Sequence, residues 1–587
     1  MEYLCRHKHP RALLLKPNGA VQLWVCRAAA NLCDSGVYVS TIIHIQSPKT
    51  LLCIHRQKRH CGGKISGVSH RLPFEPLRSG AALNCSKMAE GNRLSGFVVL
   101  YWSLNMGSRP KRGERETEQM HMRGAGSTGV NITEGIIWRQ LLAFFFPILF
   151  GTFFQQLYNT ADAMIVGRFV GKEALGAVGG ATGVLINVIV NLFVGLSAGT
   201  TVVVSQIYGA GRHGEVEGAV HTSMALALTG GLGMTVFGLL FAPLALQWMG
   251  TPAEVMPYAL TYIRIVLLGV VPSFLYNMGS GVLRAVGDTR RPVYFLIIAC
   301  LTNIVLDFVL VAGMGLGVFG AACATIASQT LSAALTLLSL NRTPACYRFL
   351  PSRVRFVRRP LNRILMVGLP AGLQSNMYAF SNIIIQTCIN SFGTDTVAAW
   401  TAHGKIDGFF WMIMGAYGIS VTTFAGQNFG ARRYDRVRES VRVGLLLAAG
   451  TSVAMSIFYC AFAEPLLGIF TDDAAVLRIG VELVWRMVPY YLTYVCVEIL
   501  AGAIRGCGNA LSPMLITAGG TCLLRIIWLL TVVPLRPALS TVLFSYPLSW
   551  TVTSLIFIFY YRRSAWLGRC ISHSAAAPLE QRPQEAV

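Results

Sequence analysis

Long apolar segments follow one another along most of this chain. From about residue 137 onward, each runs for roughly 20–28 residues and is separated from the next by a short loop containing Gly, Pro or Arg. A helix of about 20 apolar residues crosses the hydrocarbon core of a bilayer. Hydrophobic residues make up 53% of the 587 and charged residues only 13%, too few to cover the surface of a soluble protein. We therefore predict an all-α polytopic membrane protein rather than a soluble helical one.

The apolar part divides into twelve predicted helices. Loops that carry arginine follow every second helix, whereas the intervening loops carry little or none. Because cationic loops stay on the cytoplasmic side, we expect both termini in the cytoplasm and the protein in the cell (inner or plasma) membrane. The net charge of +23 has the same origin and does not indicate nucleic-acid binding. The approximate helix spans are 137–166, 174–206, 215–243, 256–285, 291–313, 316–341, 361–391, 396–425, 435–463, 478–505, 511–534 and 539–562.

The second half of the apolar part repeats the first. SQIYGAGR (Ser205–Arg212) matches GQNFGARR (Gly426–Arg433) at an offset of 221 residues. At the same offset, LRAVGDTRRP (Leu283–Pro292) matches IRGCGNALSP (Ile504–Pro513). Each copy holds six helices, and an even number keeps the two copies parallel in the membrane. We therefore predict two six-helix bundles related by a pseudo-twofold axis along the membrane normal, with a cavity between them.

The first helix of each copy carries a further match that helps to place the domains. Pro147 and Pro370 are each followed twelve residues later by an amide, Asn159 and Asn382. Residues before this repeat mix His, Cys, Arg and Gly without a sustained period. The predicted segments are a disordered leader or spurious N-terminal extension (1–131), an N-terminal bundle (132–345), a cytoplasmic linker (346–360), a C-terminal bundle (361–563) and a disordered cytoplasmic tail (564–587).

Two carboxylates lie at membrane depth in the N-terminal bundle. Asp162 is in the first helix, and Asp307 follows Asn303 by four residues in the fifth, so that both project from one helix face. A charge in such a position costs about 2.5–3.5 kcal/mol on insertion scales, so it normally faces a partner or a cavity. With Thr325 from the sixth helix, these oxygens suit a hard cation such as Na⁺, or a proton shared by the two acids. No other metal site is expected.

Amides surround these acids in the sequence and are interpreted as supporting polar groups. Gln155 and Asn159 precede Asp162 at helical spacing in the first helix. Asn187 and Asn191 are four residues apart in the second helix. For the last two, hydrogen bonding between helices is the alternative interpretation.

The C-terminal half supplies candidates for a substrate cavity. Its one clear acid at depth is Glu498, which either counters a cationic substrate or pairs with an arginine. In the eighth helix, Lys405 and Asp407 either neutralise each other or contact substrate. The candidate cavity residues are Gln374, Tyr378, Asn382, Tyr494 and Glu498.

Several segments together resemble the multidrug and toxic compound extrusion (MATE) antiporters of the prokaryotic type. They are QQLYNTADAMIVGRFVG in the first helix, TNIVLDFVLVAGMGLGVFGAACATIASQ across the fifth and sixth, and the two repeated turns; the resemblance covers about residues 132–562. It implies two V-shaped bundles and a cation site in the N-terminal one, at positions that match Asp162, Asn303, Asp307 and Thr325. Another branch of the family places an acid in the seventh helix, where this chain has Gln374 and Asn382.

The resemblance implies a secondary active transporter, not an enzyme, that exports amphipathic and cationic compounds in exchange for Na⁺ or H⁺ by alternating access. No GxxxxGK[ST] nucleotide-binding loop occurs, which agrees with an ion gradient as the energy source. The alternatives are a lipid-linked oligosaccharide flippase of a related fold, which needs an arginine-rich cavity, and a receptor or scaffold, which needs no buried acids. We expect drug-like small molecules and the lipid bilayer as partners, no nucleic acid, no cofactor and a monomer.

Overall fold

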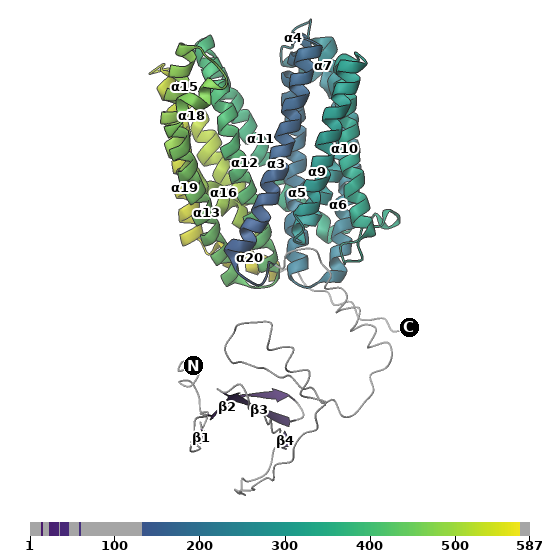
Figure 1. The fold of residues 1–587 in the computed structure, drawn as a ribbon, viewed down its shortest axis with the longest axis vertical. Coiled ribbons are helices and arrows are strands. Elements are labelled where there is room, and N and C mark those ends of the chain that lie inside the picture. Colours follow the sequence, from purple (N-terminus) through teal and green to yellow (C-terminus); the bar gives the residue numbers. More distant parts are fainter. Residues whose placement is uncertain (1–12, 16–22, 34–35, 46–57, 60–131, 576–587) are drawn as a thin grey trace. The chain divides into compact units, whose positions relative to one another are not determined.

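The computed structural model divides into two compact units, residues Met1–Arg115 and Glu116–Val587. Each unit is described by itself. The residues that the structure describes are 13–15, 23–33, 36–45, 58–59 and 132–575 (Figure 1).

Four strands lie in the first unit, over a segment expected to be an irregular leader. They pair antiparallel in the order β1-β2-β3-β4. β3 is rich in Val, Ile and Thr, the β-branched residues that strands favour. The rest of the predicted leader lies outside the described residues, so its disorder and its status as an extension stay predictions. The strands are β1 (Leu13–Leu15), β2 (Leu23–Cys33), β3 (Gly36–Ile45) and β4 (Lys58–Arg59).

Every regular element within residues 132–575 is a helix. The N-terminal bundle contains α3 (Ile137–Phe169), α4 (Lys172–Gly179), α5 (Ala181–Gly209), α6 (His213–Trp248), α7 (Met256–Leu268), α8 (Val270–Ala285), α9 (Arg290–Asp307), the π-helix η2 (Phe308–Gly313) and α10 (Gly317–Arg342). The linker holds a short 3₁₀ turn, η3 (Pro351–Arg353). The C-terminal bundle contains α11 (Arg358–Asn390), α12 (Thr394–Gly430), α13 (Tyr434–Ala461), α14 (Ala463–Gly468), α15 (Ala474–Met487), η4 (Val488–Tyr490), α16 (Tyr491–Gly506), α17 (Leu511–Thr517), the π-helix η5 (Ala518–Leu523), α18 (Leu524–Thr531) and α19 (Leu539–Arg563), followed by α20 (Trp566–Ala575).

These elements correspond to the twelve predicted helices. In the described part of the chain, ten helical stretches are long and apolar enough to cross a membrane, and the bent pair α7–α8 makes eleven. The twelfth is α11, which is 33 residues long but carries Gln374, Ser375 and Asn376 near its middle. The prediction of an all-α polytopic membrane protein is confirmed for this unit.

Some predicted helices are interrupted where glycine or proline weakens the backbone ladder. The second predicted helix breaks at Gly180, between α4 and α5, and the fourth breaks at Gly269 with a bend of 47°. The tenth contains a 3₁₀ turn at Pro489, whose nitrogen has no hydrogen to donate. The fifth changes to the π-helix η2 directly after Asp307.

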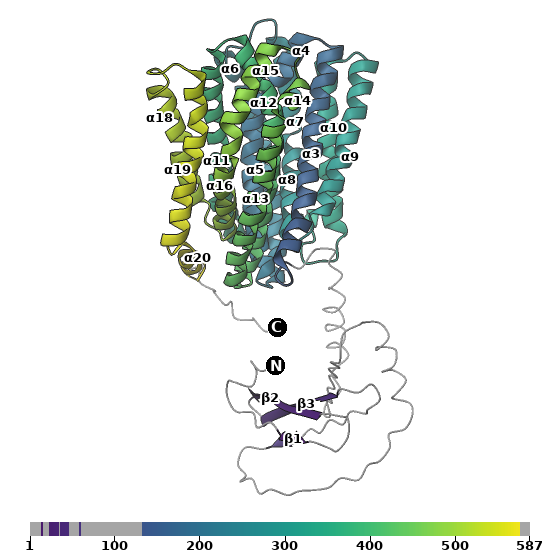
Figure 2. The same ribbon diagram turned by 60° about the vertical axis from the view of Figure 1, so that its left-hand side comes forward.

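The helices form two bundles that diverge toward one end. Figure 1 shows α4 and α7 at that end of one bundle and α15 and α18 at that end of the other, and Figure 2 shows the same unit after a turn of 60°. Since successive long helices alternate in direction, the arginine-bearing loops all lie at the opposite end, where the bundles meet. α3 begins at this meeting end and crosses toward the far end of its own bundle (Figure 1).

The bundles are joined most closely where α5 crosses α11. A Cβ atom at Gly199 would lie 2.5 Å from the carbonyl oxygen of Ile364, and one at Gly368 would lie 2.7 Å from the Cα of Leu196. Glycine therefore lets the two backbones touch, as small residues do at close helix crossings in membranes.

Two glutamines of the repeated motif join the bundles at the end where they meet. Gln206 of α5 donates from Nε2 to the carbonyl oxygen of Gly506 over 2.8 Å. Gln427 of α12 donates from Nε2 to the carbonyl oxygen of Ala285 over 2.6 Å. Donors and acceptors are both offset by 221 residues, so the two bonds are related by the pseudo-twofold axis. Both glutamine side chains are buried.

Glycines of the same motif make this contact close. A Cβ at Gly209 would overlap the carbonyl group of Gln427, and one at Gly430 would overlap that of Gln206. These contacts have the self-complementary form of an interface between two identical subunits. The duplication is thus visible in the contacts as well as in the sequence.

The ends of the C-terminal bundle differ slightly from the prediction. The linker is close to its expected bounds, since α10 ends at Arg342 and α11 begins at Arg358. The tail, predicted to be disordered, begins instead with the helix α20, which buries Trp566, Leu567 and Cys570 on one face. Residues 576–587 of the predicted tail lie outside the described residues.

Candidate functional site

Asp162 lies in α3, two turns before the helix ends. The chain passes there through the upper part of the N-terminal bundle, and only 6% of Asp162 is exposed. Its Oδ1 atom has no hydrogen-bond partner in the described part of the chain. A carboxylate oxygen in this position is available to a cation or a proton.

Asn303 and Asp307 lie one turn apart on α9 and are almost fully buried, at 0% and 1% exposed. Both carboxylate oxygens of Asp307 and both polar atoms of the Asn303 amide have no hydrogen-bond partner among the residues described. The π-helix η2 starts immediately after Asp307. Such π-segments occur often at functional sites because they change the direction of neighbouring side chains.

The two acids belong to one cluster. Asp307 interacts electrostatically with Asp162. Tyr262 of α7 lies in hydrogen-bonding contact with Asp162 and with Thr325 of α10. Four helices of the N-terminal bundle, α3, α7, α9 and α10, therefore bring these groups together.

Three residues of this cluster are absent from the sequence prediction. Tyr158 interacts electrostatically with both acids and contacts the side chain of Gln329. It precedes Asp162 by one helical turn, so its spacing could have indicated it. Neither Tyr262 nor Gln329 has a comparable signal, because each depends on how α7 and α10 pack against α3.

The chemistry of the cluster suits a hard cation or a proton. Leaving a buried polar atom without a partner costs about 1–3 kcal/mol, and more when the group is charged. Carboxylate, amide and hydroxyl oxygens from Asp162, Asn303, Asp307 and Thr325 are the ligands that Na⁺ would take in proteins. No group of three or more His, Cys, Asp or Glu side chains suited to a metal ion occurs in the described residues.

An apolar shell surrounds the cluster. Ile165 and Val166 of α3 pack with Val266 of α7, Val311 of η2 and Val318 of α10. This shell keeps water from the acids on the side of the bundle interior, so the charge of a bound ion is screened little.

The supporting amides are placed elsewhere. Gln155, Asn159 and Asn187 are exposed, and Asn191 is half-buried. Asn159 donates to Gln156 over 3.5 Å rather than to an acid of the cluster. The reason is that α3 crosses from one bundle to the other, so its middle segment is covered by neither.

In the C-terminal bundle, four of the five cavity candidates gather around α16. The hydroxyl of Tyr494 donates to Glu498 over 3.3 Å, and Tyr378 lies beside both. Gln374 donates to the hydroxyl of Thr517 over 3.3 Å. Asn382 is exposed and lies apart from this group.

Asp407 is satisfied by its own bundle. It accepts hydrogen bonds from the indole of Trp411 over 2.6 Å and from the hydroxyl of Tyr491. The expected neutralisation by Lys405 is wrong, because Lys405 lies on a different, exposed face of α12. The two positions are only two residues apart, so a helix turns their side chains about 200° from each other.

A buried arginine is a further group that the sequence reading missed. Only 2% of Arg525 is exposed; it donates to the hydroxyl of Ser549 over 3.0 Å, and its guanidinium lies 4.1 Å from the ring centre of Tyr546. These contacts hold the charge by hydrogen bonding and by cation–π attraction.

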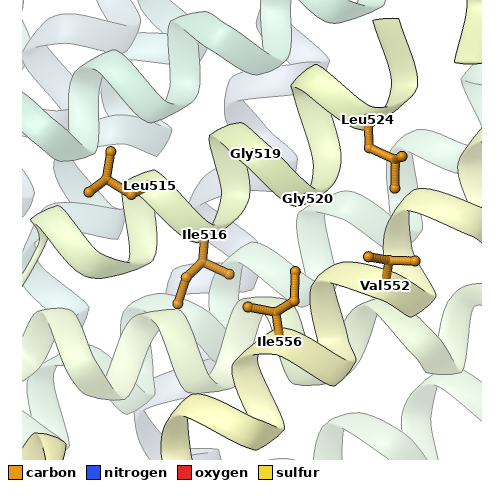
Figure 3. Close-up of a pocket in the computed structure, with 7 residues that line it drawn as sticks. All are labelled: Leu515, Ile516, Gly519, Gly520, Leu524, Val552 and Ile556. Atoms are coloured by element: carbon orange, nitrogen blue, oxygen red, sulfur yellow. The ribbon is translucent and has the colours of Figure 1, made fainter. Parts of the chain in front are cut away.

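Two open pockets lie away from the acids. One, with a volume of about 420 Å³, lies between η5 and α19 and is lined only by glycine and aliphatic residues such as Gly520, Val552 and Ile556 (Figure 3). The other, of about 370 Å³, lies between α3 and α9 and reaches Arg290. Neither contains a residue of the cation cluster.

Comparison with known proteins agrees with the duplicated architecture. The model of the MatE family matches this chain twice, over residues 147–309 and 370–531. A probable multidrug resistance protein, YoeA of Bacillus subtilis, is 27% identical over 65% of this chain and 84% of its own length. The probable multidrug resistance protein NorM of Thermotoga maritima is 25% identical over 65% of this chain and 82% of its own.

Solved structures share the fold. An outward-facing multidrug resistance MATE family transporter of the MOP superfamily superposes with a TM-score of 0.71 at 22% identity, covering 76% of this chain and 99% of that one. A MOP superfamily transporter from Pyrococcus furiosus, whose description reports a binding pocket of reverse polarity, has a TM-score of 0.71 at 21% identity and the same coverage. With the two matches of the family model covering more than half of its length, this chain belongs to the MatE family of membrane transporters.

Proposed function

We propose that this protein is a secondary active multidrug exporter that moves amphipathic compounds out of the cell in exchange for Na⁺ or H⁺. The single observation that carries the proposal is the pair Asp162 and Asp307, buried side by side with three carboxylate oxygens that have no hydrogen-bond partner in the described part of the chain. A structural role would not leave such groups unsatisfied, whereas an ion that binds and leaves requires it.

The proposed mechanism uses α3 as the moving part. By the distribution of arginine, the end where the bundles meet is cytoplasmic and the diverging end faces outward. An ion that binds Asp162 and Asp307 from outside neutralises them, which favours a different position of α3 in its bundle. Because the lower part of α3 packs on α12, with the Phe144 and Phe424 rings 5.6 Å apart, this movement is transmitted to the other bundle. The ion thereby biases the inward- and outward-facing states.

The names of the relatives support export of drug-like compounds, since YoeA and NorM are described as probable multidrug resistance proteins. The flippase alternative is not favoured. It needs cationic groups free to hold a pyrophosphate, whereas the buried guanidinium of Arg525 is held by Ser549 and Tyr546. Location in the plasma membrane with cytoplasmic termini, and a monomeric state, are parts of the same proposal.

The test is export of a fluorescent amphipathic dye from vesicles containing the purified protein, with a Na⁺ or an H⁺ gradient imposed alone. We expect one gradient to drive export in the wild type and Asp162→Asn to abolish it. Asn159→Ala, one turn away on the exposed side of α3, is the matched control and should keep export. Undiminished gradient-driven export by Asp162→Asn would refute the site.

A further inference from the structure

The two twofold-related helix crossings are not alike. The α5–α11 crossing continues up to a hydrogen bond of 3.1 Å from Asn376 to the carbonyl oxygen of Val188. The repeat offsets of 223 and 221 residues relate this pair to Phe153 on α3 and Phe409 on α12. These two side chains are 38% and 50% exposed. The α3–α12 crossing is therefore open at a level where the α5–α11 crossing is closed.

The cause lies one level nearer the meeting end. Gly368 and Leu196 touch at the closed crossing, and their repeat equivalents are Phe145 and Tyr417. The rings of Phe145 and Tyr417 stack with centres 4.1 Å apart. Two aromatic rings occupy the space that glycine leaves empty on the other side, so they hold α3 and α12 apart above this point.

Lys405 lies one turn beyond Phe409 on α12 and is exposed. It belongs to a row of residues seven apart that includes Ile419 and ends at Gly426, and residues seven apart share one helix face with a drift of about 20° per step. Gly426 packs against Ser205 of the N-terminal bundle. The ammonium group of Lys405 is therefore on the face of α12 that is turned toward the other bundle.

No acid of α3 balances this charge. The open segment of α3, residues 153–160, contains no Asp or Glu, and Asp162 is buried inside its own bundle. Asp407 is held by Trp411 and Tyr491. In the described part of the chain, Lys405 forms no ion pair. A cation without a counterion, beside the exposed rings of Phe153 and Phe409, is suited to a ligand that is both apolar and anionic.

We propose that Lys405 binds the acidic group of an amphipathic solute lying between α3 and α12. The substrates of the proposed exporter then include amphipaths with a carboxylate, zwitterions among them, and not cationic compounds alone. This inference rests on the proposed function. It also gives α3 two functional faces, the inner one for the ion at Asp162 and the outer one for the solute.

The test compares two dyes that differ only in the acid: a rhodamine with a free carboxylate and its methyl ester. Both are loaded into vesicles of fixed lipid composition containing the full protein, and gradient-driven export is measured. We expect Lys405→Gln to lower export of the acid by at least about tenfold relative to the ester, the effect of removing a charge-assisted contact. Lys405→Arg, which keeps the charge, should restore most of the difference.

Equal changes for both dyes in Lys405→Gln would overturn the inference. So would an effect that follows the content of anionic lipid in the vesicles and is the same for both dyes, since a lipid headgroup would then be the ligand of Lys405. If the wild type exports neither dye under any gradient, the proposed function itself has failed. Melting temperatures of the variants, measured in detergent, show that they are folded.

Discussion

The two bundles are copies of one unit, yet they treat buried acids in opposite ways. In the N-terminal bundle, Asp162 and Asp307 lie together with oxygens that have no partner in the described residues. In the C-terminal bundle, Asp407 accepts two hydrogen bonds from aromatic residues and Glu498 accepts one from Tyr494. The same type of residue is thus left open in one copy and satisfied in the other.

This difference separates an ion site from a structural network. A carboxylate that already accepts hydrogen bonds from Trp and Tyr loses them if an ion replaces them, so the ion gains little. A carboxylate with free oxygens gains the full interaction on binding. Burial alone therefore does not identify the coupling residue; burial without partners does.

The largest expected effect is on the open pair. Asp307→Asn removes one of the two charges that hold the ion, so gradient-driven export should fall by about 100-fold or more, to the level of empty vesicles. Dye efflux under each gradient measures it. Export within twofold of the wild type would mean that the N-terminal acids do not couple transport.

The next effect concerns stability rather than coupling. Asp407→Asn weakens the bonds from Trp411 and Tyr491, which should lower the free energy of unfolding by about 1–3 kcal/mol. The melting temperature in detergent should fall, while the ion dependence of export per folded molecule stays as in the wild type. A changed ion dependence would place Asp407 in the coupling site and erase the contrast between the bundles.

A smaller effect is expected at the residue that contacts Asp162 from outside the predicted set. Tyr262→Phe removes a hydroxyl beside Asp162 and Thr325 but keeps the ring that packs in the apolar shell. Groups in this position typically change ion affinity by about 10-fold. The ion concentration that gives half-maximal export should rise accordingly, with maximal export kept; no change would remove Tyr262 from the site.

The smallest effects are expected at the feature that the two copies share. Gln427→Leu removes one hydrogen bond between the bundles, worth about 0.5–1.5 kcal/mol, and should change export only a few-fold. Gln206→Leu should have a somewhat larger effect, because Gln206 also accepts a hydrogen bond from Arg363. Unfolding in denaturant and dye export measure both. Opposite effects of the two variants would show that the twofold bonds do not act together.

The sequence predicted the parts of this molecule that depend on single helices. Apolar length located the helices, and the rarity of acids in lipid indicated Asp162 and Asp307. What it did not predict depends on packing between helices. The role of Tyr262 requires knowing that α7 faces α3, and the partners of Asp407 require knowing that α16 lies beside α12. The exposure of Gln155 and Asn159 follows from the path of α3, which no helical periodicity contains.

The unequal crossings also bear on why the two copies are joined in one chain. A dimer of two separate, identical six-helix units would carry the same residues at both crossings, either glycine twice or aromatic rings twice. With glycine twice, both sides would close; with rings twice, neither side would hold the halves together. Fusion of the copies allowed each crossing to change by itself, so that one side became a permanent joint and the other a single lateral entrance.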